Sequence, residues 1–341
     1  MKILYALQGT GNGHVARARA LVPLLSQRGE VDVLVAGTQS QIDLGFPVQF
    51  KKFGLTMKYN SSGGVSYWKS LVGNRPLQFL KDVFSLPVKD YDLVIIDFEA
   101  ITSYACLLRG VKSLQLSHQA AYWSESTPRP TPRVWHWEFV LKYMSPSPYK
   151  IGFHFNVYDT FILPPIIRSD IRELKPTQEA HYTVYLPAYS AGTLARWFER
   201  FPNESFTVFT KENNAVNTLN TVFYRVDNKL FTNSLSRSRG LICSAGFEGP
   251  AEAMYLGKKL LITPIKGQYE QAANAICAAG EGATVFRHLN EEAIPVFERF
   301  FQSKYVVKKA WPDFAEGLVA CILDNAKKGK ALDDISALKL H

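Results

Sequence analysis

Short apolar runs alternate with helical patterns along most of this 341-residue sequence. Apolar strands separated by helices of ten to fifteen residues are typical of a parallel sheet covered on both faces. The pattern therefore predicts doubly wound α/β structure in the first half. The strands expected there are residues 2–8, 31–37, 47–53, 91–97 and 111–117, and the helices include residues 14–27 and 99–108.

The second half repeats the alternation after a proline-rich connection at Pro164-Pro165, which is extended and stiff. We predict two Rossmann-like domains that face each other across a cleft, with ligands at the C-terminal ends of both sheets. Their expected bounds are residues 1–163 and 164–341, and the last helix could pack back on the first domain. The strands expected in the second half are residues 182–188, 205–211, 221–226, 240–246, 258–265 and 283–289, with helices beginning near 248 and 268.

Composition narrows the class of protein. With 47% hydrophobic and 20% charged residues, the chain has the composition of a globular protein. The four cysteines form no C-x-x-C pair, which argues against a structural zinc site and a disulfide framework and favours a reducing, cytoplasmic location. We expect no signal peptide and no membrane span, because the apolar runs are too short. The net charge of +9 lies mostly in the first 150 residues, but the basic residues are scattered and not interleaved with aromatic residues, so nucleic-acid binding is not expected.

A glycine-rich loop follows the first strand and opens a helix, so its backbone amides could hold an anion. The loop fails the dinucleotide pattern, since histidine stands where the third glycine belongs, and it is not a Walker A loop. Its candidate binding residues are Gly11, Asn12 and Gly13. His14 lies at the first turn of the helix, where a neutral imidazole could act as a general base or could merely pack the loop.

A second candidate site spans residues 242–275. Small residues at Ser244, Ala245 and Gly246 would let a phosphate approach the following helix. Glu248 and Glu252 share one face of that helix. The next strand leads into a polar turn and a helix that carry the remaining candidates, Gln268, Glu270, Gln271 and Asn274.

These residues resemble the GT-B glycosyltransferases, and among them the MurG-like, family 28-type enzymes. The pattern S-x-G-x5-E-x4-G, then proline and an acid-Gln pair before Asn-Ala, is matched by Ser244, Gly246, Glu252, Gly257, Pro264, Glu270, Gln271 and Asn274-Ala275. The N-terminal G-x-G-N-G-H-x-x-R loop, the Asp97-Phe98-Glu99 segment and the Ser117-His118-Gln119 segment also match. The resemblance covers nearly the whole chain.

The resemblance implies an inverting sugar transfer from a nucleotide sugar, with UDP expected, to an acceptor hydroxyl. Glu252 would bind the ribose, residues 244–246 the diphosphate, and Glu270 with Gln271 the sugar. His14 or Glu99 would be the base, and His118 would bind substrate. Helix dipoles and amides would stabilise the leaving diphosphate, so no cofactor and no metal are expected. The acceptor would be a saccharide or a lipid-linked cell-envelope precursor.

Several residues also have simpler explanations. Glu252 could be a solvated helix acid, Glu270 and Gln271 could cap their helix, and Asp97 could cap the helix that follows it. Asp90-Tyr91-Asp92 has the form of a D-x-D metal motif, but it precedes its strand and is interpreted as a turn. A sugar-nucleotide epimerase of the same fold and a non-catalytic nucleotide-sugar-binding subunit remain alternatives.

An aromatic and basic segment lies between the two candidate sites. It could rest on the inner face of a membrane or contact a lipid-linked sugar, although Glu138 interrupts its apolar pattern and ordinary packing explains it equally well. Its residues are Trp123, Trp135, Trp137, Phe139 and Tyr143, among Arg129, Arg133 and Lys142.

Overall fold

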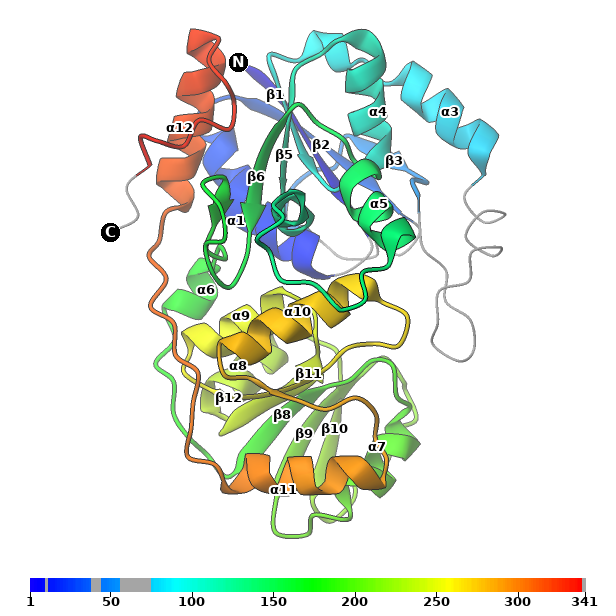
Figure 1. Ribbon diagram of the computed structural model, residues 1–341, viewed down its shortest axis with the longest axis vertical. Coiled ribbons are helices and arrows are strands. Elements are labelled where there is room, and N and C mark those ends of the chain that lie inside the picture. The colour runs from blue at the N-terminus through cyan, green and yellow to red at the C-terminus, as the bar shows by residue number, and fades with distance from the viewer. Residues whose placement is uncertain (10–11, 38–43, 56–74, 339–341) are drawn as a thin grey trace. The chain divides into compact units, whose positions relative to one another are not determined.

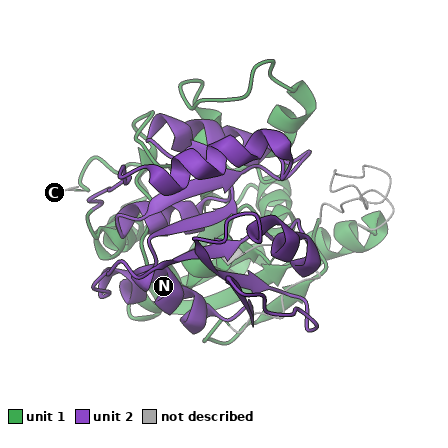
Figure 2. Cartoon of the chain, turned by 90° about the horizontal axis from the view of Figure 1, so that it is seen from below, with its two compact units in different colours: residues 1–168, 312–341 green, residues 169–311 purple. Residues whose placement is uncertain are grey.

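The computed structural model describes residues 1–9, 12–37, 44–55 and 75–338 (Figure 1). The chain divides into two compact units, which we call unit 1 and unit 2 (Figure 2). Unit 1 consists of residues 1–168 and 312–341, and unit 2 of residues 169–311. Each unit is built on one parallel sheet.

Unit 1 contains a seven-stranded sheet in the order β3-β2-β1-β4-β5-β6-β7, and every pairing is parallel. The chain starts at a central strand, moves to one edge and then crosses to the other side, so the strand order switches direction between β1 and β4. The strands are β1 (Lys2–Gln8), β2 (Glu30–Ala36), β3 (Phe50–Lys52), β4 (Leu93–Asp97), β5 (Ser113–Ser117), β6 (Tyr149–Phe153) and β7 (Ile162–Leu163).

The helices of unit 1 include one that comes from the end of the chain. They are α1 (Asn12–Ser26), α3 (Pro76–Ser85), α4 (Ala100–Arg109), α5 (Trp135–Tyr143) and α12 (Ala315–Lys328), with 3-10 turns η1 (Val88–Asp90) and η2 (His118–Trp123). Figure 1 shows α12 beside α1, and the Arg28 guanidinium donates to Glu316 Oε1 at 2.6 Å. The second unit ends at residue 311 and not at the expected residue 341, because α12 packs on α1 and residues 312–341 belong to unit 1, in agreement with the expectation that the last helix could pack back on the first domain.

Unit 2 has the same strand order over six parallel strands, β10-β9-β8-β11-β12-β13, with the switch between β8 and β11. Its strands are β8 (His181–Tyr185), β9 (Ser205–Thr210), β10 (Thr221–Arg225), β11 (Gly240–Ser244), β12 (Lys259–Thr263) and β13 (Thr284–Val285). Its helices are α6 (Ser169–Arg172), α7 (Ala191–Phe198), α8 (Asn228–Arg237), α9 (Glu248–Tyr255), α10 (Tyr269–Gly280) and α11 (Ile294–Gln302), with the turn η3 (Glu291–Ala293). Both units thus confirm the predicted doubly wound fold.

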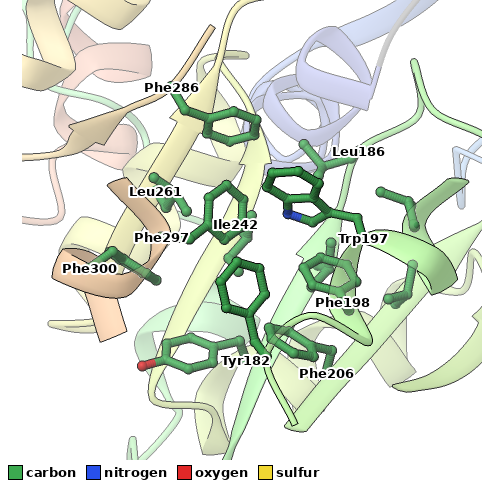
Figure 3. Close-up of a cluster of buried hydrophobic side chains, with 14 of the residues drawn as sticks. Tyr182, Leu186, Trp197, Phe198, Phe206, Ile242, Leu261, Phe286, Phe297 and Phe300 are labelled. Atoms are coloured by element: carbon green, nitrogen blue, oxygen red, sulfur yellow. The ribbon is translucent and has the colours of Figure 1, made fainter. Parts of the chain in front are cut away.

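Each sheet is covered by an apolar core. In unit 2 aromatic rings dominate it (Figure 3), and the Phe198 and Phe206 rings stack with centroids 4.0 Å apart. In unit 1 the core beneath α3 and α4 is mostly aliphatic and includes Leu4, Val94 and Ile101. These side chains leave water completely, which supplies most of the driving force for folding.

The pattern missed α3 altogether, and it placed several strand ends too far along the chain. The expected strand at 283–289 is only two residues long as β13, because the chain turns away toward η3. Among the described residues, no helix is both long and apolar enough to cross a membrane.

Gly152 on β6 allows η2 to lie against the sheet. A Cβ at this position would come within 2.6 Å of the Ala121 backbone nitrogen and 2.7 Å of its Cα. We therefore expect Gly152→Ala to lower the free energy of unfolding by about 2 kcal/mol, because backbone cannot yield as a flexible side chain does. Gly192→Ala is the control, since its Cβ would meet only the end of the Arg196 side chain, at 3.8 Å. Thermal denaturation measures both, and equal melting temperatures would contradict this explanation.

Candidate functional site

The candidate base lies at the switch point of unit 1. His14 stands in the first turn of α1, directly after β1, and Asp97 is the last residue of β4. The parallel strands β1 and β4 are neighbours, so both residues lie at the same edge of the sheet. The two side chains meet at 2.8 Å, between His14 Nδ1 and Asp97 Oδ1. The fold thereby brings the predicted base into contact with a carboxylate that lies 83 residues away in the sequence.

Arg17 is the third member of this group, which we call the Asp97 cluster (His14, Arg17 and Asp97). Arg17 lies one turn after His14 on α1. Its Nε donates to Asp97 Oδ2 at 2.9 Å, and a terminal nitrogen donates to Oδ1 at 3.1 Å. Burial by itself raises the pKa of Asp97, but the Arg17 guanidinium and the His14 ring outweigh it and hold the pKa below its usual range. Asp97 is therefore an ionised carboxylate with no exposed surface.

Phe98 shapes the other side of the imidazole. Its ring lies nearly parallel to that of His14, at 8° and 6.4 Å between centroids. Its backbone has φ of 55°, a left-handed conformation that costs a non-glycine residue on the order of 1 kcal/mol or more. Strained residues of this kind concentrate at functional sites, where surrounding contacts hold them in place.

Glu99, the other candidate base, caps a helix. Its two carboxylate oxygens accept the backbone N–H groups of Ile101 and Thr102 at 2.6 and 2.7 Å, at the start of α4. Burial raises the pKa of Glu99, although these backbone donors oppose the shift. The side chain is completely buried and both of its oxygens are engaged, so it is poorly placed to take a proton from a substrate. The capping role considered for Asp97 thus belongs to Glu99.

His118 belongs to a buried polar group around the ends of β5 and β6. Its Nδ1 donates to the Phe153 carbonyl at 2.8 Å, and its ring lies 4.9 Å from that of His154. Burial, together with His118 and Arg129, lowers the pKa of His154 well below its usual range. Arg129 in turn donates to Glu138 of α5 at 2.9 Å. Sequence analysis missed His154, which no motif marked.

In unit 2 the predicted phosphate turn follows β11. The Ala245 N–H donates to the Thr263 carbonyl at 2.8 Å, and the buried Asn274 amide donates to the Ala245 carbonyl at 3.2 Å. Asn274 therefore positions the turn from α10. Gly246 has open space where a side chain would stand, and Ser244 Oγ is buried with no hydrogen-bond partner among the described residues. This turn offers room and unused polar capacity for a ligand.

The remaining candidates of unit 2 lie on α9 and α10. Glu252 is buried at 6% exposure, so it is not a solvated helix acid. Gln271 accepts the Ile265 N–H at 3.0 Å and ties the polar turn to its helix. Gln268 is the residue before α10, but its side chain makes no capping bond. Glu248 and Glu270 lie in the first turns of α9 and α10, where helix dipoles favour negative charge.

The glycine loop is described only in part. Gly11 lies outside the described residues, whereas Asn12 and Gly13 begin α1. Among the parts of the chain that the structure describes, no group of three or more His, Cys, Asp or Glu side chains could hold a metal ion. Asp92 instead accepts the Lys2 backbone N–H at 2.7 Å, in agreement with its interpretation as part of a turn.

The model of glycosyl transferase family 1 matches residues 1–302. The chain belongs to this family. It is therefore a glycosyltransferase, and the family supports transfer of a sugar from a nucleotide sugar. No curated protein sequence matches the chain significantly.

Solved structures of GT-B glycosyltransferases share the fold over nearly the full chain. Acinetobacter baumannii MurG is 14% identical with a TM-score of 0.53, and the match covers 88% of this chain and 90% of MurG. Arabidopsis thaliana UGT89C1, solved with UDP, is 14% identical with a TM-score of 0.58 and 98% coverage of both chains. A Polygonum tinctorium UDP-glucosyltransferase is 12% identical with a TM-score of 0.59, covering 96% of this chain and 93% of the enzyme. At these identities the likeness shows the GT-B fold.

Acid should destabilise unit 1 through His154. Unfolded histidine takes up a proton near pH 6.5, whereas folded His154 stays neutral, so the unfolded state gains stability as the pH falls below 6.5. We expect the free energy of unfolding to fall between about pH 7 and pH 5, and to fall less in His154→Phe. The exposed His288 provides the control variant, His288→Gln, which should keep the wild-type dependence. Urea titrations at several pH values measure the slopes, and parallel slopes for His154→Phe and wild type would refute this assignment.

Proposed function

We propose that the protein transfers a sugar from a UDP-sugar to an acceptor hydroxyl, with inversion at the anomeric carbon and without a metal ion. The observation that carries the proposal is the contact between His14 Nδ1 and the ionised Asp97. A carboxylate on Nδ1 selects the tautomer that carries its proton there, which leaves the Nε2 lone pair to accept a proton. His14 is then the general base for the acceptor hydroxyl, and Asp97 orients it.

The donor is assigned to unit 2. The small residues 244–246 and the start of α9 would bind the diphosphate, with backbone amides and the helix dipole facing the charge. Glu252 would hold the ribose hydroxyls, and Glu270 with Gln271 the sugar hydroxyls. As the sugar leaves, the same amides and dipoles stabilise the negative charge that develops on the diphosphate. The preference for UDP rests on the resemblance and on relatives such as UGT89C1, which was solved with UDP.

Analysis of the reaction products distinguishes a transferase from the two alternative functions. An epimerase would convert the nucleotide sugar into an isomer without any acceptor, and a non-catalytic subunit would bind the donor without turnover. The His14–Asp97 pair favours a transferase. It forms a single general base, and a general base of this type activates a nucleophile such as the acceptor hydroxyl.

The acceptor is proposed to be a saccharide or a lipid-linked precursor, reached by peripheral contact with a membrane. The supporting observation is the outer face of α5, where Trp135 and Phe139 are 78% and 59% exposed. Glu138, which seemed to interrupt this face, bonds Arg129 on the inner side of α5 instead. Exposed aromatic rings beside cationic side chains suit the interface of a bilayer.

A second exposed apolar group supports the same contact. It lies on α3 and α4, which pack together, and it consists of Leu77, Leu80, Phe84, Leu107 and Leu108. The Tyr104 hydroxyl of α4 donates to the Tyr143 carbonyl at 2.8 Å, so α4 also adjoins α5. Exposed apolar side chains that gather on neighbouring helices are typical of an interaction surface.

Donor binding and catalysis can be tested separately. A ligand that binds only the folded protein raises the melting temperature, so we expect UDP-sugars to raise it, and the best of them identifies the donor. With that donor and a panel of saccharide and phenolic acceptors, His14→Ala should keep the thermal shift and lose transfer by about 10²-fold or more. Glu99→Gln should keep transfer within a few-fold, because Glu99 caps α4. Full transfer by His14→Ala would overturn the base assignment.

Membrane contact is tested on vesicles that contain about one third anionic lipid. We expect the protein to cosediment with them, and Trp135→Ser with Phe139→Ser to weaken binding by about tenfold through lost apolar burial. Leu219→Ser is the control, since this fully exposed residue lies in unit 2. Equal binding by the double variant and the control would argue against the α5 surface.

A further inference from the structure

The Asp97 carboxylate is shared between two hydrogen-bonding partners, His14 and Arg17, which is more than the orientation of one imidazole requires. His14 engages Oδ1 alone, whereas Arg17 contacts both oxygens at 2.9 and 3.1 Å. Arg17 is only 4% exposed, and its guanidinium lies over the Phe153 ring at 5.4 Å. A buried arginine that contacts both oxygens of a carboxylate has its geometry set by its partners on every side.

We propose that Arg17 is a positioning residue that neutralises and orients Asp97, so that the carboxylate holds the Nδ1 proton of His14 and leaves Nε2 free to accept a proton. This inference rests on the proposed role of His14 as the general base. Arg17 touches no substrate in this scheme, because it acts through Asp97.

The argument is electrostatic. A buried carboxylate with histidine as its only partner would attract a proton onto the imidazole strongly, since the pair inside a low-dielectric environment is stabilised as imidazolium and carboxylate. A His14 ring that already carries both protons could not remove the proton from the hydroxyl group of the sugar acceptor. The Arg17 charge already balances Asp97 and also repels a second positive charge on the ring. The carboxylate then directs the Nδ1 proton without drawing another proton to Nε2.

Arg17 supplies the charge that balances Asp97, because the other charged groups in this part of unit 1 have partners of their own. Burial, Arg17 and His14 account for the shifted pKa of Asp97. Glu99, two residues along the chain, is held by the α4 amides. At the ends of β5 and β6, His118 and His154 contact each other, and Arg129 bonds Glu138. Among the described residues Arg17 is thus the cation that faces Asp97 opposite the histidine.

The test uses the full chain without any substrate. In protein labelled with ¹³C-histidine, the His14 ring signal is identified by its loss in His14→Gln and followed by NMR from about pH 5 to pH 9. In Arg17→Gln we expect the His14 titration midpoint to rise by about one pH unit or more. In Arg17→Lys, which keeps the charge, the midpoint should stay within about half a unit of wild type.

The matched control is Arg28→Gln, since Arg28 follows α1 and bonds the exposed Glu316. It should leave the His14 midpoint unchanged. If Arg17→Gln does not fold, Arg17→Met replaces it, because its apolar chain can still pack on Phe153. An unchanged or lower His14 midpoint in a folded neutral variant would overturn the proposal.

The test also separates this inference from the proposed function. If His14→Ala transfers sugar normally, the base assignment fails whatever the NMR midpoints are. If His14→Ala is inactive but the Arg17 variants titrate like wild type, only the role of Arg17 fails. If His14→Ala is inactive and Arg17→Gln raises the His14 midpoint, both assignments hold. The acidic limb of the kcat/KM profile of Arg17→Gln should then move to higher pH, in parallel with the NMR midpoint.

Discussion

Burial of the Asp97 carboxylate is the constraint on which the arrangement of unit 1 depends. An ionised group removed from water is costly unless hydrogen-bond donors and an opposite charge surround it, and both donors, His14 and the cationic Arg17, come from one turn of α1. This requirement links the last residue of β4 to the beginning of α1 at the strand-order switch. It also directs the imidazole, because a histidine that donates through Nδ1 to a fixed carboxylate has little rotational freedom.

Unit 2 repeats the strand order of unit 1, but the turn that follows its switch strand β11 consists of uncharged residues. Small residues and backbone amides follow β11, and the buried Asn274 holds them in place through the Ala245 carbonyl. This difference suits a division of labour, since an anionic diphosphate is best received by amides and helix starts, whereas a proton acceptor needs a charged partner. The common fold thus places an ionised carboxylate with its donors at the switch point of unit 1, and small residues with backbone amides at the equivalent position of unit 2.

The sequence predicted the parallel sheets because buried strands appear as continuous apolar runs, and motif matching marked His14, Glu252 and Asn274. It could not predict which side chains meet, because the His14–Asp97 contact spans 83 residues. Arg17 is the last residue of the G-x-G-N-G-H-x-x-R match but was assigned no role, since an arginine in an alanine-rich helix looks like an exposed residue. The helix α3 was missed although Leu77, Leu80 and Phe84 recur at helical spacing, and the structure leaves these three side chains exposed.

Asp97 and Glu99 show that the position of an acidic residue relative to the end of a strand determines which partner its side chain binds. Asp97 is still part of β4, so its side chain meets the helix that follows the neighbouring strand β1. Phe98 then turns the backbone into a left-handed conformation, and Glu99 is directed to the first amides of its own helix. One acid therefore couples two distant segments, and the other satisfies the local start of α4. Exchange of their roles would require a different turn at Phe98, so the strain at this residue helps to assign each carboxylate to its partner.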